Sequence, residues 1–299
     1  MSAIADRIAA EFADAGAVGW VHATAADGTA EAEVSAGADR PVALASVYKL
    51  PLVIAMMRMV DSGELDPTAR TTVKARARTE GPTGISTLRD DVTMSWRDLA
   101  AMMMTVSDNA AADAILHRVG VDRIARTLDA LDLTHSRIVG GAADTYRLLH
   151  LDTGTTSFTE ALKTLADTDD VLDPRAYDPL HTSSATAREV TTLLTAVWTD
   201  TAASPASCTF IRDVMGRQVF SSRLASGFPY AGVRVAGKTG TMGALRHEVG
   251  VVHYDGERPY AVAVFTQSAR AAPAQPRLDA AIGRAAWLAV DHLRETAMR

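Results

Sequence analysis

The sequence predicts a two-lobed α/β fold, in which an antiparallel sheet flanked by the two terminal helices carries an inserted all-α lobe. Two strand-like runs, at 18–24 and 30–35, surround Asp27-Gly28, and such a dipeptide strongly favours a hairpin. From residue 46 to about residue 215 the apolar residues mostly follow a helical period, and short β-type runs return only in the last third. A single hairpin is marginal in water, so we expect the early pair to join the late strands in one sheet.

The first element is an amphipathic helix. The opening residues, MSAIADRIAAEFADAG, carry acids at Asp6, Glu11 and Asp14 and lack the charged-then-apolar order of a secretory signal. We therefore expect a cytoplasmic protein.

The inserted lobe is expected to consist of helices joined by polar loops. The periodicity predicts helices at 47–59, 96–105, 109–119, 122–131, 158–165 and 187–198. Polar segments are expected as loops at 80–91, 140–157 and 167–186. Loops of this length often carry function.

The last third returns to strands and closes with a helix. Strands are predicted at 233–236, 249–254 and 260–265, and a helix with an apolar stripe at 279–293. The resulting division is a discontinuous α/β lobe at 1–45 and 217–299 and an all-α lobe at 46–216, with the active site between them.

Composition argues against several partners. The 299 residues are 47% hydrophobic and 22% charged, as in a soluble globular protein. Lys and Arg number 30 against 36 Asp and Glu, a net charge of −6, and no basic block could neutralise phosphates, so we expect no nucleic acid. The most apolar stretch, 50–60, contains Arg58 and is shorter than the roughly 20 residues that span a bilayer, so we expect no membrane insertion.

No metal or cofactor is expected either. The single cysteine, Cys208, has no Cys or His nearby at ligand spacing. The histidines also lack spacings typical of a metal site, such as i and i+4 on one helix.

Three short strings carry the chemical signal. Ser46-Val47-Tyr48-Lys49 begins an apolar helix, Ser107-Asp108-Asn109 stands at a loop-to-helix junction, and Lys238-Thr239-Gly240 ends a strand. Each alone has an ordinary explanation as a helix cap, a solvated lysine or a turn. Together, in this order, they resemble the serine β-lactamase and penicillin-binding protein superfamily, with class A β-lactamases the nearest branch. Further segments, at 43–65, 94–112 and 233–252, resemble that family, and the likeness covers most of the chain except about 134–180.

The residue types fit acyl transfer. A serine hydroxyl is a poor nucleophile unless a nearby base takes its proton. Residues i and i+3 share a helix face, so Lys49 can lie beside Ser46. Lysine becomes a base when burial and a second cation, here Lys238, lower its pKa.

The resemblance implies roles for the remaining site residues. Ser107 would pass a proton toward the leaving nitrogen, and Asn109 would hold Lys49 and the substrate amide. Lys238 and Thr239 would bind a substrate carboxylate. The backbone N–H groups of Ser46 and Thr241 would form the oxyanion hole, and Gly240 would let the substrate lie close to the strand.

Charged residues near the third string offer further candidates. The family often has an arginine that helps to hold the carboxylate; Arg223 is the first choice for it and Arg246 the second, with salt bridging as the alternative for both. His247 and Glu248 are expected to begin or stabilise the following strand.

The resemblance breaks at the residue that would release the acyl group. Class A β-lactamases carry a Glu-x-x-Leu-Asn string whose glutamate activates water, and this sequence lacks it. The expected region is acidic but out of pattern, and a replacement base could come from Asp167, Asp169 or Asp170, each of which could equally be a solvated loop acid. Efficient β-lactam turnover is therefore not implied.

Three functions remain open. The first is a serine acyl-enzyme hydrolase of class A β-lactamase type, acting on a β-lactam or related small-molecule amide. The second is a cytoplasmic transacylase, esterase or peptidase with the same Ser-Lys acylation machinery. The third is a penicillin-binding sensor that is acylated without turnover. The sequence leaves the substrate and the oligomeric state open.

Overall fold

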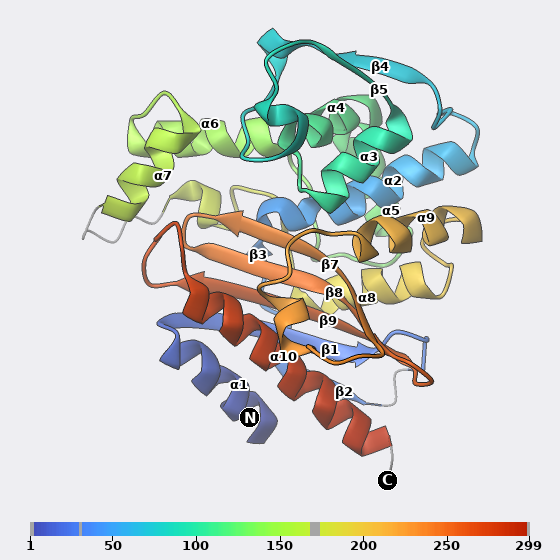
Figure 1. Ribbon diagram of the computed structural model, residues 1–299, viewed down its shortest axis with the longest axis vertical. Coiled ribbons are helices and arrows are strands. Elements are labelled where there is room, and N and C mark those ends of the chain that lie inside the picture. Colours follow the sequence, from blue (N-terminus) through green and yellow to red (C-terminus); the bar gives the residue numbers. More distant parts are fainter. Residues whose placement is uncertain (1–2, 30–31, 168–173, 298–299) are drawn as a thin grey trace.

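The computed structural model describes residues 3–29, 32–167 and 174–297. Its main feature is a five-stranded antiparallel sheet in the order β2-β1-β9-β8-β7 (Figure 1). The strands are β1 (Ala17–Ala25), β2 (Glu33–Ala36), β7 (Val233–Met242), β8 (Leu245–Tyr254) and β9 (Pro259–Ser268). The prediction that the early hairpin joins the late strands is confirmed, and so is the two-lobed α/β fold class.

The sheet is covered on both faces. Successive side chains of a strand point to opposite sides, so each strand contributes to two cores. On β9, Val262 and Val264 pack with the terminal helices α1 (Ala3–Asp14) and α10 (Pro276–Ala297). Ala263 and Phe265 pack instead into the core of the inserted region. Figure 1 shows the two terminal helices lying across one face of the sheet.

The inserted region is mostly helical. Its helices are α2 (Lys49–Asp61), α3 (Trp96–Thr105), α4 (Asn109–Val119), α5 (Val121–Asp129), α6 (Ala142–Thr153), α7 (Phe158–Asp167), α8 (Ala187–Trp198) and α9 (Pro205–Gly216). Two small sheets pair β3 (Val42–Ala43) with β6 (Ser184–Ala185), and β4 (Arg70–Val73) with β5 (Val92–Ser95). The exact lobe boundaries drawn from the sequence stay a prediction.

Several expected bounds need correction. The segment 140–157, expected as a loop, contains α6. Its helical signal is weak because Ala142 and Leu149 are the buried residues of this helix, which leaves little apolar periodicity. The three late strands are also longer than predicted, since pairing extends them through polar and glycine residues.

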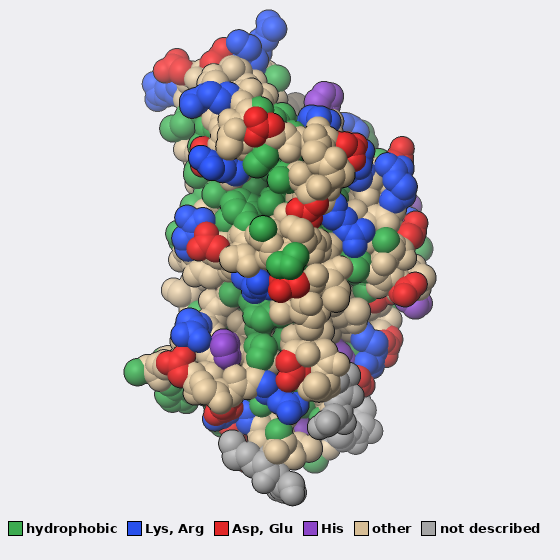
Figure 2. Space-filling view, turned by 90° about the vertical axis from the view of Figure 1, so that its right-hand side faces the viewer, with side chains coloured by type: hydrophobic (Ala, Val, Ile, Leu, Met, Phe, Trp, Pro, Cys, Tyr) green, Lys and Arg blue, Asp and Glu red, His purple; other side chains and the backbone are tan. Residues whose placement is uncertain are grey.

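In the part of the chain that the structure describes, no helix combines the length and apolar character needed to cross a membrane. The face drawn in Figure 2 intersperses side chains of both charges rather than gathering one sign.

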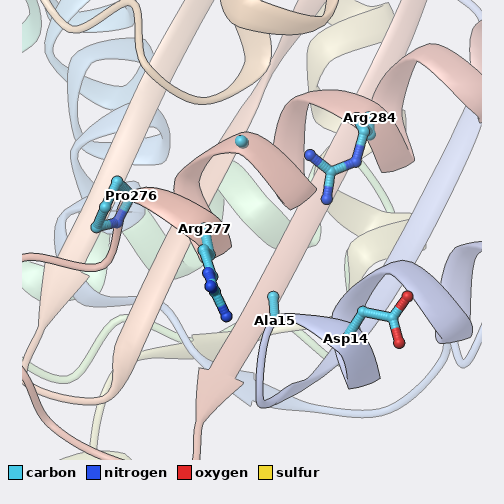
Figure 3. Close-up of a pocket in the computed structure, with 6 residues that line it drawn as sticks. Asp14, Ala15, Pro276, Arg277 and Arg284 are labelled. Carbon is cyan, nitrogen blue, oxygen red and sulfur yellow. The ribbon is translucent and has the colours of Figure 1, made fainter.

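A shallow hollow lies where the terminal helices meet. Figure 3 shows Asp14 and Ala15, at the end of α1, on one side of this hollow and Arg277 and Arg284 of α10 on the other. Arg284 forms an ion pair there with Glu11. That ion pair links the two helices, and the side chains that line the hollow include no nucleophile.

Helix α10 also makes a close backbone contact that positions the site. Gly283 lies against the short 3₁₀ helix η5 (Leu224–Gly227), where an added Cβ would stand 2.6 Å from the carbonyl oxygen of Arg223 and 2.8 Å from the nitrogen of Gly227. Both neighbours are backbone atoms, so neither can rotate away. Glycine is therefore required at this crossing.

Gly283→Ala should lower the free energy of unfolding by about 1–3 kcal/mol, because it forces two backbone segments apart. Gly216→Ala is the matched control, since its Cβ would meet nothing within 4 Å at the end of another helix. Urea unfolding of both variants measures the difference. Equal stability of the two would contradict the close-packing argument.

Candidate active site

The candidate nucleophile lies at a tight turn. Ser46 belongs to the 3₁₀ helix η1 (Ala45–Tyr48), which runs directly into α2. The backbone N–H of Lys49 donates to the carbonyl of Ser46, and 3₁₀ geometry eclipses side chains i and i+3. The residue before the serine, Ala45, has a φ of 44°, a left-handed conformation that is rare outside glycine. The turn therefore places Ser46 and Lys49 on one side of the chain.

Lys49 is fully buried and connects α2 with the α3–α4 junction. Its Nζ donates to the carbonyl oxygen of Ser107 at 2.6 Å and to Oδ1 of Asn109 at 2.8 Å, and it lies 3.3 Å from Oγ of Ser107. The first and second strings of the sequence are thus in direct contact.

Lys238 brings the third string to the same place. It is also fully buried, on edge strand β7, and its Nζ donates to Oγ of Ser107 at 2.9 Å and to the carbonyl of Thr239 at 2.8 Å. The hydroxyl of Ser107 therefore lies between two lysine amines.

Burial disfavours the protonated form of both lysines and so lowers their pKa. Desolvation lowers the pKa of Lys49 to about 7 although Asp108 and Asp113 act in the opposite direction. Desolvation, followed by the nearby charge of Lys49, holds the pKa of Lys238 well below its ordinary value. Near neutral pH, a lysine with a pKa of about 7 can accept a proton.

The second string is held in a strained but well-supported conformation. Ser107 has a φ of 59°. The next residue, Asp108, is buried and caps α4 by accepting from the nitrogen of Ala111, while its carboxylate also binds Ile85 and Ser86 of the preceding loop. These contacts fix the loop and stabilise the unusual backbone at Ser107.

The outer edge of β7 offers a backbone N–H to the site. Thr239 donates its N–H to Oε1 of Gln218, so this N–H faces away from β8. Alternate residues of a strand share a direction, which turns the N–H of Thr241 to the same open edge. At Gly240 an added Cβ would lie 2.9 Å from the carbonyl oxygen of Leu44, so glycine lets β7 approach the nucleophile turn.

Both candidate arginines bind one carboxylate. Arg223 donates from Nε to Oδ1 of Asp279 at 2.8 Å, and Arg246 binds both carboxylate oxygens at 2.9 Å. Arg223 also donates to the hydroxyl of Thr241 at 2.7 Å. Both arginines line the cavity, but a part of their hydrogen-bonding capacity serves this buried ion pair.

His247 and Glu248 lie on β8, as expected. Nε2 of His247 donates to the carbonyl of Ala43 at 3.0 Å, because Nδ1 accepts from the backbone N–H of Thr266. Burial lowers the pKa of His247 to about 3, so it stays neutral. It ties the chain just before Ser46 to the sheet.

These groups surround a cavity of about 420 Å³. Its lining includes Ser46, Ser107, Asn109, Thr239 and Thr241, so the structure brings together the residues predicted from the three strings. Lys49 and Lys238 lie behind this lining, with their amines bound to Ser107.

One wall of the cavity was not predicted from the sequence. Helix α6 contributes Ala142, Thr145 and Tyr146, at the i, i+3 and i+4 spacing of one helix face, and α7 contributes Phe158. The rings of Tyr146 and Phe158 are stacked with centroids 3.8 Å apart. The i, i+4, i+7 spacing of Ala142, Tyr146 and Leu149 is the sequence signal that could have revealed this helix.

Of the three predicted replacement acids, the structure describes one, and that one lies away from the cavity. Asp167 is exposed at the end of α7 and does not line it, while Asp169 and Asp170 fall outside the described residues. Among the described side chains that line the cavity, Asp279 is the one carboxylate, and its two arginine partners lower its pKa against the effect of burial. A carboxylate held in this way is a weak base.

Within the described ranges, no group of three or more His, Cys, Asp or Glu side chains is arranged to hold a metal ion.

Comparison with known proteins identifies relatives over the full length of the fold. A family model described as "Beta-lactamase enzyme family" matches residues 3–293. A curated relative, the beta-lactamase regulatory protein BlaB of Streptomyces cacaoi, is 30% identical over 290 residues, covering 88% of this chain and 89% of that protein.

Solved structures share the architecture at lower identity. A β-lactamase from Sphaerobacter thermophilus superposes with a TM-score of 0.77 at 23% identity, covering 99% of this chain and 97% of that one. A mutant of PBP-A, solved as an acyl-enzyme complex with penicillin G, gives a TM-score of 0.76 at 18% identity, covering 97% and 96%. With its family match over residues 3–293, this chain belongs to the β-lactamase enzyme family.

Proposed function

We propose that the protein is a serine acyl-enzyme that reacts with β-lactams or related small-molecule amides through Ser46. The observation that carries this proposal is the bridge of Lys49 and Lys238 through the hydroxyl of Ser107, next to the nucleophile turn. This bridge supplies a hydrogen-bonded path between the two amines.

In the proposed acylation, neutral Lys49 takes the proton of Ser46 as Oγ attacks the lactam carbonyl. The new bond joins Oγ to the carbonyl carbon, and the ring C–N bond breaks. The leaving nitrogen receives a proton from Ser107, which regains one from the lysine that was protonated. The N–H groups of Ser46 and Thr241 stabilise the oxyanion.

The positive end of the cavity suits a substrate carboxylate. Lys238 lies behind Thr239, and Arg223 reaches the hydroxyl of Thr241. A carboxylate at this edge of β7 would gain charge-assisted hydrogen bonds. Substrates that carry such a group beside the reactive amide, as penicillins do, fit this arrangement.

Release of the acyl group is the slow step in this proposal. Among described cavity-lining residues, the carboxylate is Asp279, which is paired with two arginines. Burial raises the pKa of Tyr146, so its phenol is a poor base as well. A water molecule at the acyl carbonyl therefore lacks a strong base among these side chains.

A β-lactam receptor is the second candidate. The relative from Streptomyces cacaoi is named a β-lactamase regulatory protein. A long-lived acyl-enzyme would serve such a role, since occupancy of Ser46 would report the drug. The same chemistry then supports sensing rather than destruction of the β-lactam.

Ser46→Ala should abolish the mass increase that penicillin G produces on the intact protein, because no other residue is proposed as nucleophile. Ser62→Ala, at the C-terminal end of the following helix α2, is the control and should be labelled like the original protein. Persistence of the adduct for many minutes supports slow release, whereas rapid product without adduct indicates an efficient β-lactamase. Full labelling of the Ser46 variant would refute the mechanism.

The acylation rate should rise with pH through about 7, because unprotonated Lys49 is the base. Below that pKa the rate should fall about tenfold for each pH unit. Stopped-flow acylation at a series of pH values on both sides of neutrality measures this profile, with circular dichroism as the check that the fold persists. A rate independent of pH over this range would exclude Lys49 as the base.

A further inference from the structure

The orientation of the Asn109 amide is fixed by its neighbours. One amide atom faces the backbone carbonyl of Glu80 at 3.1 Å, and a carbonyl can only accept. That atom is therefore Nδ2, and Oδ1 is the atom that accepts from Lys49 at 2.8 Å.

Both hydrogens of this amide are already used. Nδ2 donates one hydrogen to the Glu80 carbonyl and the other to Oη of Tyr146 at 2.6 Å. An amide nitrogen has two hydrogens, so Asn109 retains none for a substrate. The substrate-holding role that the family resemblance implies for Asn109 is thus blocked in this arrangement.

Tyr146 has a donor to offer instead. Because its oxygen accepts from Asn109, its own O–H hydrogen is not consumed by that contact. Within the described ranges no acceptor lies at hydrogen-bond distance from this hydroxyl. The residue lines the cavity, and stacking on Phe158 with an interplanar angle of 18° holds its ring in place.

The phenol also stays protonated. Burial, with Asp113 and Glu80 nearby, raises the pKa of Tyr146 above its ordinary value. A neutral phenol that accepts one hydrogen bond becomes a better donor in the next, because hydrogen bonds in a chain polarise one another.

We propose that Tyr146 is a specificity-determining residue whose hydroxyl donates to the side-chain amide carbonyl of an acylamino substrate, relaying the hydrogen bond that Asn109 cannot make directly. This inference rests on the proposed acylation of Ser46 and concerns the acyl side of the substrate. The stacked pair of Tyr146 and Phe158 would receive an apolar or aromatic acyl group beside that carbonyl.

Tyr146→Phe tests the donor because it removes one oxygen and keeps the ring that stacks on Phe158. Two probes differ in the relevant group: penicillin G has the side-chain amide carbonyl, and 6-aminopenicillanic acid has a free amine instead. Intact-protein mass spectrometry gives the second-order acylation rate for each. We expect the variant to lose about tenfold with penicillin G and less than about twofold with 6-aminopenicillanic acid.

Tyr230→Phe is the matched control, since this tyrosine is exposed and outside the cavity; it should leave both rates unchanged. If the Tyr146→Phe variant lost acylation rate equally with both probes, the role of Tyr146 would be structural. If penicillin G acylated the Tyr146→Phe variant faster than the unaltered protein, Tyr146 would obstruct Asn109, and this result would also overturn the proposal. If the unaltered protein is acylated by neither probe, the proposed function itself fails and this inference with it.

Discussion

The burial of two lysine amines around one serine hydroxyl is the constraint on which the site depends. Lys49 comes from a helix, Lys238 from an edge strand, and Ser107 from a junction between helices, and both lysines are fully buried. Removing an ammonium group from water is costly unless acceptors replace the water. The carbonyls of Ser107 and Thr239 and the amide of Asn109 do so. The three segments must therefore converge together, and the left-handed backbone at Ser107 is tolerated because it presents a carbonyl and a hydroxyl to these amines.

Hydrogen bonds of Glu248 and Gln218 determine which backbone N–H groups at the edge of β7 are covered. Glu248 accepts from Leu224 and from Nε2 of Gln218, and Gln218 in turn accepts from the N–H of Thr239. This chain satisfies a buried carboxylate and covers one N–H of an edge strand, which would otherwise be free to pair. The N–H of Thr241 is left for the cavity. The open N–H of this edge therefore lies at the end of β7 that is next to the nucleophile turn.

Sequence reasoning succeeded where general rules of chain geometry and strand stability apply. The i, i+3 pair of Ser46 and Lys49 and the return of strand periodicity in the last third follow from chain geometry alone, and the sheet follows from the instability of a lone hairpin. It failed on α6, whose few buried residues give a weak pattern. It also left Arg223 and Arg246 as alternatives, because only the folded chain shows that both bind Asp279. The contact between Asn109 and Tyr146 joins two separate helices, and no local pattern encodes it.

In the proposed function, the α6–α7 segment connects recognition of the substrate with the fate of the acyl group. Hydrolysis needs a base and a water molecule next to the acyl carbonyl, whereas the α6–α7 side of the cavity presents the stacked rings of Tyr146 and Phe158. An aromatic wall contributes apolar contact and one phenol donor but no base at neutral pH. In the proposed function, such a wall in place of a water-activating carboxylate would strengthen binding of the acyl group and slow its release. The proton path proposed for acylation runs through Lys49, Ser107 and Lys238, which come from other segments, so in this proposal the wall influences acylation through substrate binding alone.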